Sequence, residues 1–285
     1  MGGRASSSPK PSAWFSTADR LLRTRVLTAV VVVAVLLAAL LWLPPVLFRF
    51  LVGGVVLAAA HEWARLCGLV SVGAVAYAGA LVVAWGGLLT VPSLHLPLLL
   101  LSAVFWAVAV PLWLRRGFLP GPRGVLLATG AIVLLPAGVA MASLQPVQLL
   151  VLIGLSAVAD TAAYFAGRAW GRRKLAPAIS PGKTWEGVAG GAAGCLIYAT
   201  ICAMLVPEFQ GRIHGAGWVF LLSGAVLLCA ASVLGDLLES ALKRRAGAKD
   251  SGRLLPGHGG ALDRIDSATA ALPAGLLLLL AGGLA

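Results

Sequence analysis

The sequence predicts an all-α polytopic membrane protein with about nine transmembrane helices. Hydrophobic residues make up 60% of the 285-residue chain and charged residues only 11%, against roughly 45–50% and about 25% in soluble domains. The mean hydropathy is +0.95. The apolar residues are grouped in runs close to the 20 or so residues that a helix needs to cross a bilayer. These three observations exclude a soluble globular protein.

Nine apolar segments are candidates for membrane-spanning helices. In chain order they are residues 26–43, 46–61, 69–91, 95–114, 124–142, 147–166, 187–206, 217–239 and 267–285. A basic leader with the composition of a disordered tail, residues 1–25, precedes the first segment. No small-residue cleavage site follows that segment, so we expect it to be retained rather than removed as a signal peptide. The second segment is short, because Arg49 and Glu62 interrupt it, and it is expected to tilt or to enter the membrane partway.

The basic residues predict the orientation of the chain. With a cytoplasmic N-terminus, only two of the 22 Lys and Arg residues, Arg49 and Arg212, fall outside. Because Lys and Arg in short loops stay in the cytoplasm, we expect a multi-pass protein of the cell membrane with its C-terminus outside. The N-terminal membrane helices then occupy residues 26–145. A C-terminal catalytic region, residues 146–285, carries cytoplasmic loops at 167–186 and 240–266.

The net charge of +12 does not indicate a nucleic-acid partner. The basic residues avoid the long apolar runs and cannot form one continuous face. The four cysteines lie in or beside apolar segments, without the spacing of a zinc site or a disulfide framework. They are expected to be buried core residues.

Acidic residues are few, and most lie between residues 160 and 266 on the predicted cytoplasmic side. Asp160 is six residues before the inner end of its predicted span, roughly 9 Å below the interface. A carboxylate at that depth usually faces a polar cavity, a partner charge or an ion. A structural hydrogen bond to a neighbouring helix is the alternative.

Two further acidic clusters are expected at the same membrane face. Asp236 and Ser240 are four residues apart and share one helical face with Glu239 between them. Asp263 and Asp266 lie where the last span begins, where Asp266 or Ser267 would be suited to cap the helix. Like-charged clusters repel one another unless a cation neutralises them. Mg²⁺, held by one or two carboxylates and substrate phosphate oxygens, would do so.

The segment between these clusters has the composition of a phosphate site. In residues 240–266, basic side chains alternate with glycines, including Gly259 and Gly260 next to His258. Glycines let backbone amides approach anionic oxygens, and cations beside metal-binding acids suit phosphoryl or nucleotidyl transfer. His258 is a candidate phosphate donor or general acid/base. A loop that only follows the orientation rule or contacts anionic lipids is the alternative.

A second polar segment, residues 160–187, ends in a hydroxyl, a cation and another hydroxyl. Ser180, Lys183 and Thr184 are expected in a turn ahead of the next helix, where its N-terminus would favour a phosphate. The spacing differs from that of a P-loop, and no strand is expected before it.

At this point the chain resembles the CTP-dependent phosphatidate cytidylyltransferases, also called CDP-diacylglycerol synthases. The family signature is a Ser, two residues, Lys-Arg, then Lys-Asp, and finally His-Gly-Gly followed by Asp-Arg and Asp. It is filled here by Ser240, Lys243, Arg244, Lys249, Asp250, His258, Gly259, Gly260, Asp263, Arg264 and Asp266. Residues 180–187 and 235–240 also look like family elements, so the resemblance covers roughly residues 150–285.

The resemblance implies that CTP and phosphatidate react to give CDP-diacylglycerol and pyrophosphate, with Mg²⁺ and, as a further candidate, K⁺ in the site. It implies Asp236 and Asp263 as metal ligands, with Asp266 assisting. The implied catalytic group is completed by Lys183, Lys249 and His258. The implied substrate-binding group is Ser180, Lys183, Thr184, Ser240, Lys243, Arg244, Lys249, Gly259, Gly260, Arg264 and Asp160. Membrane lipids and a second copy of the chain, in a homodimer, are the implied partners.

Three other functions are alternatives to a phosphatidate cytidylyltransferase. A cation-coupled transporter is disfavoured because the acids cluster at one membrane face and no inverted repeat is visible. The signature of the CDP-alcohol phosphatidyltransferases is absent. An enzyme of the CDP-archaeol synthase or polyprenol kinase type, which uses CTP to activate or phosphorylate another lipid, stays open.

Overall fold

The computed structural model describes residues 30–31, 34–35, 37–115, 121–254 and 259–284. In these ranges the chain is largely helical, and eight segments are long and apolar enough to cross a membrane. The predicted all-α polytopic fold is therefore confirmed. Much of the first predicted span, residues 26–43, lies outside the described residues. All four cysteines are free and buried, as expected.

The helices follow the predicted spans closely at most of their ends. They are α2 (Pro45–Leu66), α3 (Ser71–Thr90), α4 (His95–Val104), α5 (Val110–Arg115), α6 (Arg123–Ser143), α7 (Pro146–Trp170), α8 (Trp185–Leu205), α9 (Ala216–Arg245) and α10 (Leu262–Ala281). A short 3₁₀ turn, Pro92–Leu94, and a π-helical turn, Phe105–Ala109, join α4 and α5 into one candidate span, Pro92–Arg115. The second span is an unbroken helix of 22 residues, so the chain does not turn back within it.

Two helices extend into the segment that the sequence assigned to the loop at residues 240–266. Helix α9 is 30 residues long and ends at Arg245, and α10 begins at Leu262. Leu238 and Leu242 are buried, so the apolar face of α9 continues past residue 239. The basic side chains of its last turn also favour the negative end of the helix dipole. Ser240, Lys243, Asp263 and Asp266 are therefore held on rigid helices.

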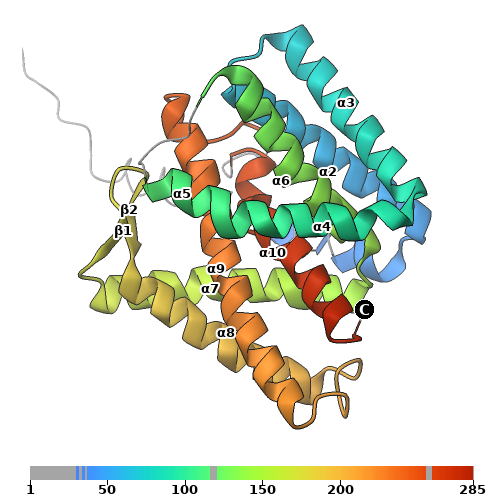
Figure 1. Ribbon diagram of the computed structural model, residues 1–285, viewed down its shortest axis with the longest axis vertical. Helices are drawn as coiled ribbons and strands as arrows, with labels where there is room; N and C mark the ends of the chain where they lie inside the picture. Colours follow the sequence, from blue (N-terminus) through green and yellow to red (C-terminus); the bar gives the residue numbers. More distant parts are fainter. Residues whose placement is uncertain (1–29, 32–33, 36, 116–120, 255–258, 285) are drawn as a thin grey trace, which may run out of the picture.

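The predicted turn at residues 180–184 is instead a β-strand. Strand β1 (Lys174–Ala176) pairs antiparallel with β2 (Ser180–Thr184), with Lys174 opposite Thr184. The expectation that no strand precedes the helix was wrong. Strands this short, with a Pro and a Gly in one of them, give almost no sequence signal. In Figure 1 this hairpin projects beside the ends of α7 and α8.

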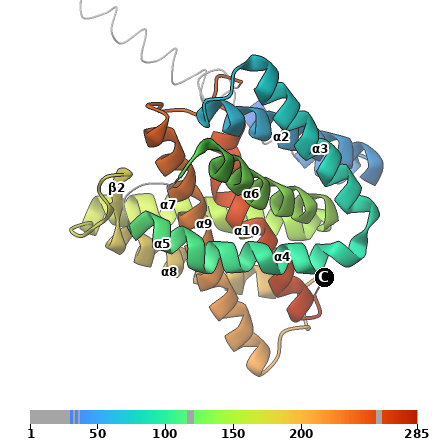
Figure 2. The same ribbon diagram turned by 45° about the horizontal axis from the view of Figure 1, so that its top comes forward.

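Helix α10 lies in the middle of the bundle. Figures 1 and 2 show it surrounded by the other helices, and it packs against α2, α4, α6, α7 and α9. Its first turn is therefore within reach of elements from both halves of the chain.

Helices α7 and α8 form a close antiparallel pair (Figure 1). A Cβ atom at Gly190 would overlap Ala166, and one at Gly194 would overlap Ala162. Small residues let the two backbones approach closely. This contact fixes the hairpin and the N-terminus of α8 against the end of α7 that carries Asp160.

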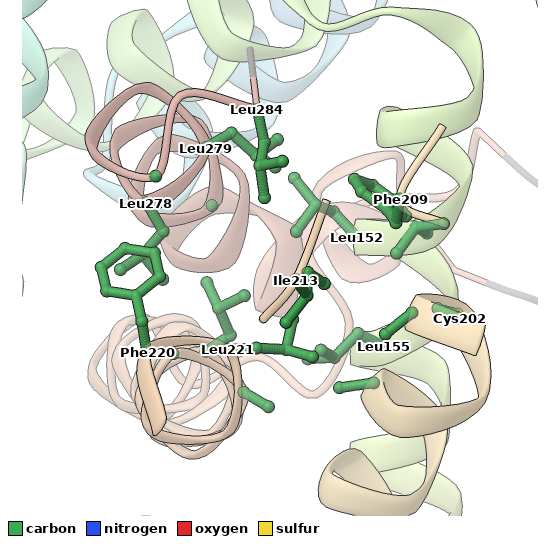
Figure 3. Close-up of a pocket in the computed structure, with 18 of the residues that line it drawn as sticks. Leu152, Leu155, Cys202, Phe209, Ile213, Phe220, Leu221, Leu278, Leu279 and Leu284 are labelled. Carbon is green, nitrogen blue, oxygen red and sulfur yellow. The ribbon is translucent and has the colours of Figure 1, made fainter. Parts of the chain in front are cut away.

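Two cavities lie at opposite ends of the helices α7, α8 and α9, and α10 lines only the first of them. Figure 3 shows the first, about 130 Å³, where labelled apolar side chains such as Leu152, Phe209 and Leu279 face one space. The second is about 490 Å³ and lies toward the hairpin. Only the second is lined by several charged side chains.

Candidate active site

The polar cavity lies between the hairpin and the ends of α7, α8 and α9. Its polar lining residues are Asp160, Tyr164, Arg168, Ser180, Lys183, Thr184 and Asp236. The structure thus brings Asp160, the hairpin residues and Asp236 of α9 to a single pocket. Its volume, about 490 Å³, is in the range of small-molecule sites.

An ion pair between the hairpin and α9 lines this pocket. Lys183 Nζ is 2.5 Å from Asp236 Oδ2, and Ser240 Oγ donates a hydrogen bond to Asp236 Oδ1 at 3.1 Å. The side chains of Lys183 and Asp236 are 24% and 26% exposed. Both charges are therefore partly accessible to a ligand.

Asp160 faces the pocket and is also hydrogen-bonded to a neighbouring helix. Ser267 Oγ, on α10, donates to Asp160 Oδ2 at 3.2 Å. Helix α7 continues to Trp170, so Asp160 is ten residues from its end, about 15 Å along the axis. Asp160 is exposed toward the cavity. Asp160 therefore both faces a polar cavity and makes a structural hydrogen bond to a neighbouring helix, the two interpretations that the sequence leaves open.

Three carboxylates approach one another beside this pocket. The charges of Asp160, Asp236 and Asp266 are close enough to interact, and Lys183 offsets part of their repulsion. Asp266 Oδ1 accepts a hydrogen bond from the Ser267 N–H at 2.7 Å. Residue 235 on α9 is a glycine, and this allows α10 to come so close. Any Cβ atom at this position would overlap the Asp266 carbonyl oxygen.

A second charged cluster lies deeper between α9 and α10. Lys243 Nζ is 2.7 Å from Asp263 Oδ1 and 3.1 Å from Glu239 Oε1. The three side chains are only 13%, 7% and 2% exposed, in the order Lys243, Asp263 and Glu239. A buried ion pair of this kind is costly to break by removing one partner. Lys243 therefore holds α9 and α10 together.

Asp263 is held by backbone groups as well. Its Oδ2 accepts hydrogen bonds from the Ser251 N–H at 2.9 Å and the Gly260 N–H at 2.8 Å. Gly259 has a φ of +84°, a conformation that glycine adopts readily, and a Cβ atom there would approach Asp263 Oδ2. The glycines predicted to approach an anion thus surround a carboxylate of the chain itself.

The carboxylates differ in how well they suit a divalent ion. Across the described ranges, no three acidic, histidine or cysteine side chains converge tightly enough to form a ready-made metal site. Asp236 and Asp266 supply hard oxygens from two helices. Mg²⁺ commonly takes one or two carboxylates and fills its remaining positions with water and phosphate oxygens. Asp263 suits this role less, because its side chain is only 7% exposed whereas that of Asp236 is 26% exposed.

Of the remaining predicted residues, Thr184 lines the polar cavity and the described basic residues do not. Lys249 and Arg264 are exposed. Arg244 donates to the carbonyl oxygens of Ile179 and Ala248, each at 3.4 Å, so it ties α9 to the hairpin. Thr184 Oγ1 accepts from the Gly187 N–H at 3.1 Å and caps α8. His258 lies outside the described residues.

Three side chains near the site were missed from the sequence. Arg168 and Tyr164 line the pocket from α7. Glu62 on α2 contacts the segment just before α10. In the sequence, Glu62 is notable only as an acid at the end of an apolar segment, and there it indicates an interruption of the span rather than a contact with α10.

Comparison with known proteins gives one consistent family. A model of the cytidylyltransferase family matches residues 23–281. The chain is 42% identical over 273 residues to a phosphatidate cytidylyltransferase of Pseudomonas aeruginosa, covering 92% of this chain and 98% of that protein. It is 37% identical over 289 residues to one of Haemophilus influenzae, covering 89% and 96%. One of Brucella suis is 53% identical over 112 residues, 39% of each chain. The similarity therefore extends well into the N-terminal half.

Proposed function

Because this chain belongs to the cytidylyltransferase family, we propose that it transfers a cytidylyl group from CTP to phosphatidate. The products are CDP-diacylglycerol and pyrophosphate. Relatives named phosphatidate cytidylyltransferase, similar over most of the chain, support this choice of substrates. The observation in the site that carries it is the Lys183–Asp236 pair, which offers a cation and a carboxylate to one polar pocket.

The reaction needs positioning and charge neutralisation more than proton transfer. A phosphate oxygen of phosphatidate attacks the α-phosphorus of CTP, and the bond to the bridging oxygen of the β-phosphate breaks. Pyrophosphate leaves with that electron pair. The lipid phosphate is already ionised near neutral pH, so no strong general base and no covalent enzyme intermediate are required. Catalysis of this type depends on bringing two polyanions together in line.

The residues of the pocket suit separate parts of this task. Lys183 and Ser180 on β2 contact phosphate oxygens, and Arg168 on α7 lies across the same pocket. Lys249 and Arg264, both exposed, attract the triphosphate from solvent. Lys243 keeps α9 and α10 in register through Asp263. Ser240 orients Asp236 through its hydrogen bond to Oδ1.

Mg²⁺ is the proposed cofactor, with K⁺ as a further candidate. When bound, Mg²⁺ supplies positive charge between the two phosphate groups. Asp236 and Asp266 are the carboxylates proposed to hold it, because Asp236 lines the pocket and Gly235, the residue before it, packs against the backbone of Asp266. Asp263, the third predicted ligand, is less accessible than Asp236, because it is buried against Lys243.

The lipid substrate implies a site at the membrane surface. We place the pocket on the cytoplasmic side of the cell membrane, because basic residues gather at this end of α7 and α9. Tyr164 and Phe165, both exposed on α7, suit contact with acyl chains and headgroups at the interface. The homodimer remains a prediction from the family resemblance.

A turnover assay tests this function. Purified protein in mixed micelles is given labelled CTP, phosphatidate and Mg²⁺, and chloroform-soluble CDP-lipid is measured. We expect Asp236→Asn to abolish product formation, and the matched charge removal Glu208→Gln, in the loop between α8 and α9, to leave it unchanged. Full activity of a folded Asp236→Asn variant would remove this aspartate from the mechanism.

The same assay separates the closest alternative. Polyprenyl phosphate and an unphosphorylated polyprenol replace phosphatidate in parallel reactions, and dATP replaces CTP. We expect product only with CTP and phosphatidate. A preference for a polyprenol, with CDP released, would instead identify a CTP-dependent lipid kinase.

A further inference from the structure

Glu62 is a buried acid on α2 that contacts the segment leading into α10. It is 7% exposed and lies far in sequence from its partners. Its Oε1 accepts a hydrogen bond from the Ala261 N–H at 3.0 Å, and its Oε2 accepts from the Leu262 N–H at 2.9 Å. Ser251 Oγ also donates to Oε2, at 2.8 Å. One carboxylate thus satisfies three donors.

These contacts supply a cap that α10 lacks locally. The residue before the helix is Ala261, whose side chain cannot accept a hydrogen bond. The first N–H groups of a helix have no partner within it, and the positive end of its dipole favours a carboxylate. The sequence offered Asp266 or Ser267 as the cap, but α10 begins at Leu262, ahead of both. The cap comes instead from α2.

The surrounding backbone is shaped to receive this side chain. A Cβ atom at Gly260 would overlap both Glu62 carboxylate oxygens and Ser251 Oγ, and one at Gly252 would overlap the Glu62 carboxyl group. The two glycines therefore allow the chain to close around the carboxylate. The packing of apolar side chains alone would not require a glycine at either position.

Neighbouring groups of the same two segments hold Asp263. Ser251 N–H and Gly260 N–H donate to Asp263 Oδ2, and the Asp263 N–H donates to Ser251 Oγ at 3.3 Å. Asp263 in turn holds Lys243. A continuous series of hydrogen bonds therefore runs from Glu62, through Ser251, to the Asp263–Lys243 pair.

We propose that Glu62 is a positioning residue for the active site, which orients Asp263 and Lys243 through the backbone of residues 251 and 260–262. Its catalytic consequence rests on the proposed function. A carboxylate is required because every partner is a donor: glutamine at this position would direct an amide NH₂ at Ser251 or Leu262. The N-terminal half of the chain thereby contributes directly to the geometry of the site.

The test uses the full-length protein in mixed micelles. Glu62→Gln keeps the size of the side chain but loses an acceptor, and Glu62→Asp keeps both acceptors on a shorter side chain. The matched control is Gln148→Ala. Gln148 is also buried, and it donates to the Leu284 carbonyl and accepts from the Gln145 N–H at the other end of the bundle.

Two measurements report positioning. Hydrogen exchange of residues 249–264 needs no substrate, and we expect Glu62→Gln to accelerate it about 10-fold or more while Gln148→Ala leaves it unchanged. We expect kcat to fall about 10- to 100-fold in Glu62→Gln, the usual range for loss of a group that orients a catalytic one. KM for CTP should change much less, and Glu62→Asp should recover part of kcat.

Unchanged exchange in folded Glu62→Gln would overturn the proposal. The proposal would also be overturned if Glu62→Gln and Gln148→Ala lowered the melting temperature equally and kcat fell no further in Glu62→Gln than in Gln148→Ala. If Glu62→Gln does not fold, Ser251→Ala, which removes the two hydrogen bonds of Ser251 Oγ and leaves the Glu62 contacts with Ala261 and Leu262, carries the same measurements. If the wild-type protein makes no CDP-lipid, the proposed function fails, and the exchange comparison still decides whether Glu62 positions the backbone.

Discussion

Lys183 and Asp236 illustrate how single residues of the site depend on one another. Their charges are 2.5 Å apart and each side chain is about a quarter exposed. A partly solvated pair of this kind contributes only about 0.2–1 kcal/mol to stability. Its value to the protein therefore lies in the charge that it presents to the pocket.

Lys183→Met should lower turnover at least about 100-fold, because the pocket loses a cation and Asp236 becomes a repulsive neighbour for phosphate. The melting temperature should change little. Asp236→Asn should lower turnover much less in the Lys183→Met protein than in the wild type, because the effects of substitutions at two residues of one ion pair are not additive. Steady-state kinetics of the four proteins measures this coupling, and simple additivity would contradict a shared role.

At the scale of elements, the hairpin and α8 act as one unit at the pocket. Thr184 ends β2 and caps α8, and the carboxylate of Glu186 accepts hydrogen bonds from the N–H groups of Arg172 and Arg173 at the start of the hairpin. The cap therefore joins the segment that carries Lys183 to the helix behind it.

Thr184→Ala should destabilise the protein by about 1 kcal/mol, as expected for loss of a helix cap. Thr184→Ser keeps the oxygen and should retain most of that stability. Denaturant titration followed by circular dichroism compares the two variants. Equal stability of Thr184→Ala and Thr184→Ser would show that the hydrogen bond to Gly187 contributes nothing.

The α7–α8 contact makes a second prediction at this scale. Gly190→Ala places a methyl group against Ala166 and should cost about 1–3 kcal/mol, the range for overpacking. Gly79→Ala in α3 meets nothing within 4 Å and should be neutral or slightly stabilising. Thermal unfolding in detergent distinguishes the two, and a melting temperature of Gly190→Ala equal to that of the wild type would contradict the close contact.

At the scale of the whole molecule, the site forms at one end of the bundle. The eight candidate spans alternate in direction if each crosses the membrane once. The hairpin, the end of α9 and the start of α10 then share one side with the basic ends of α2 and α5. The loop between α8 and α9 and the apolar cavity of Figure 3 lie toward the other side.

Cysteine labelling tests the proposed orientation. A membrane-impermeant maleimide should label Glu208→Cys in intact cells and Gly182→Cys only after permeabilisation. Both positions are exposed, and the four native cysteines are buried, so background labelling should be low. The reverse pattern would place the catalytic pocket outside the cell and exclude cytosolic CTP as its substrate.

The sequence determined the features that depend on local composition and spacing. Apolar runs of sufficient length predict the membrane helices, because the bilayer requires internally hydrogen-bonded apolar segments. The spacing of Asp236 and Ser240 predicts a shared helix face, and the two residues are hydrogen-bonded. The signature residues also carried the family resemblance, which the comparisons bear out.

Only the tertiary structure decided which acids meet which partners. It separates Asp236, which faces the pocket with Lys183, from Asp263, which is buried with Lys243. It also brings Glu62 to the start of α10 from the other half of the chain. These pairings depend on how distant helices pack, whereas hydropathy and spacing report only interactions between residues that are near in sequence.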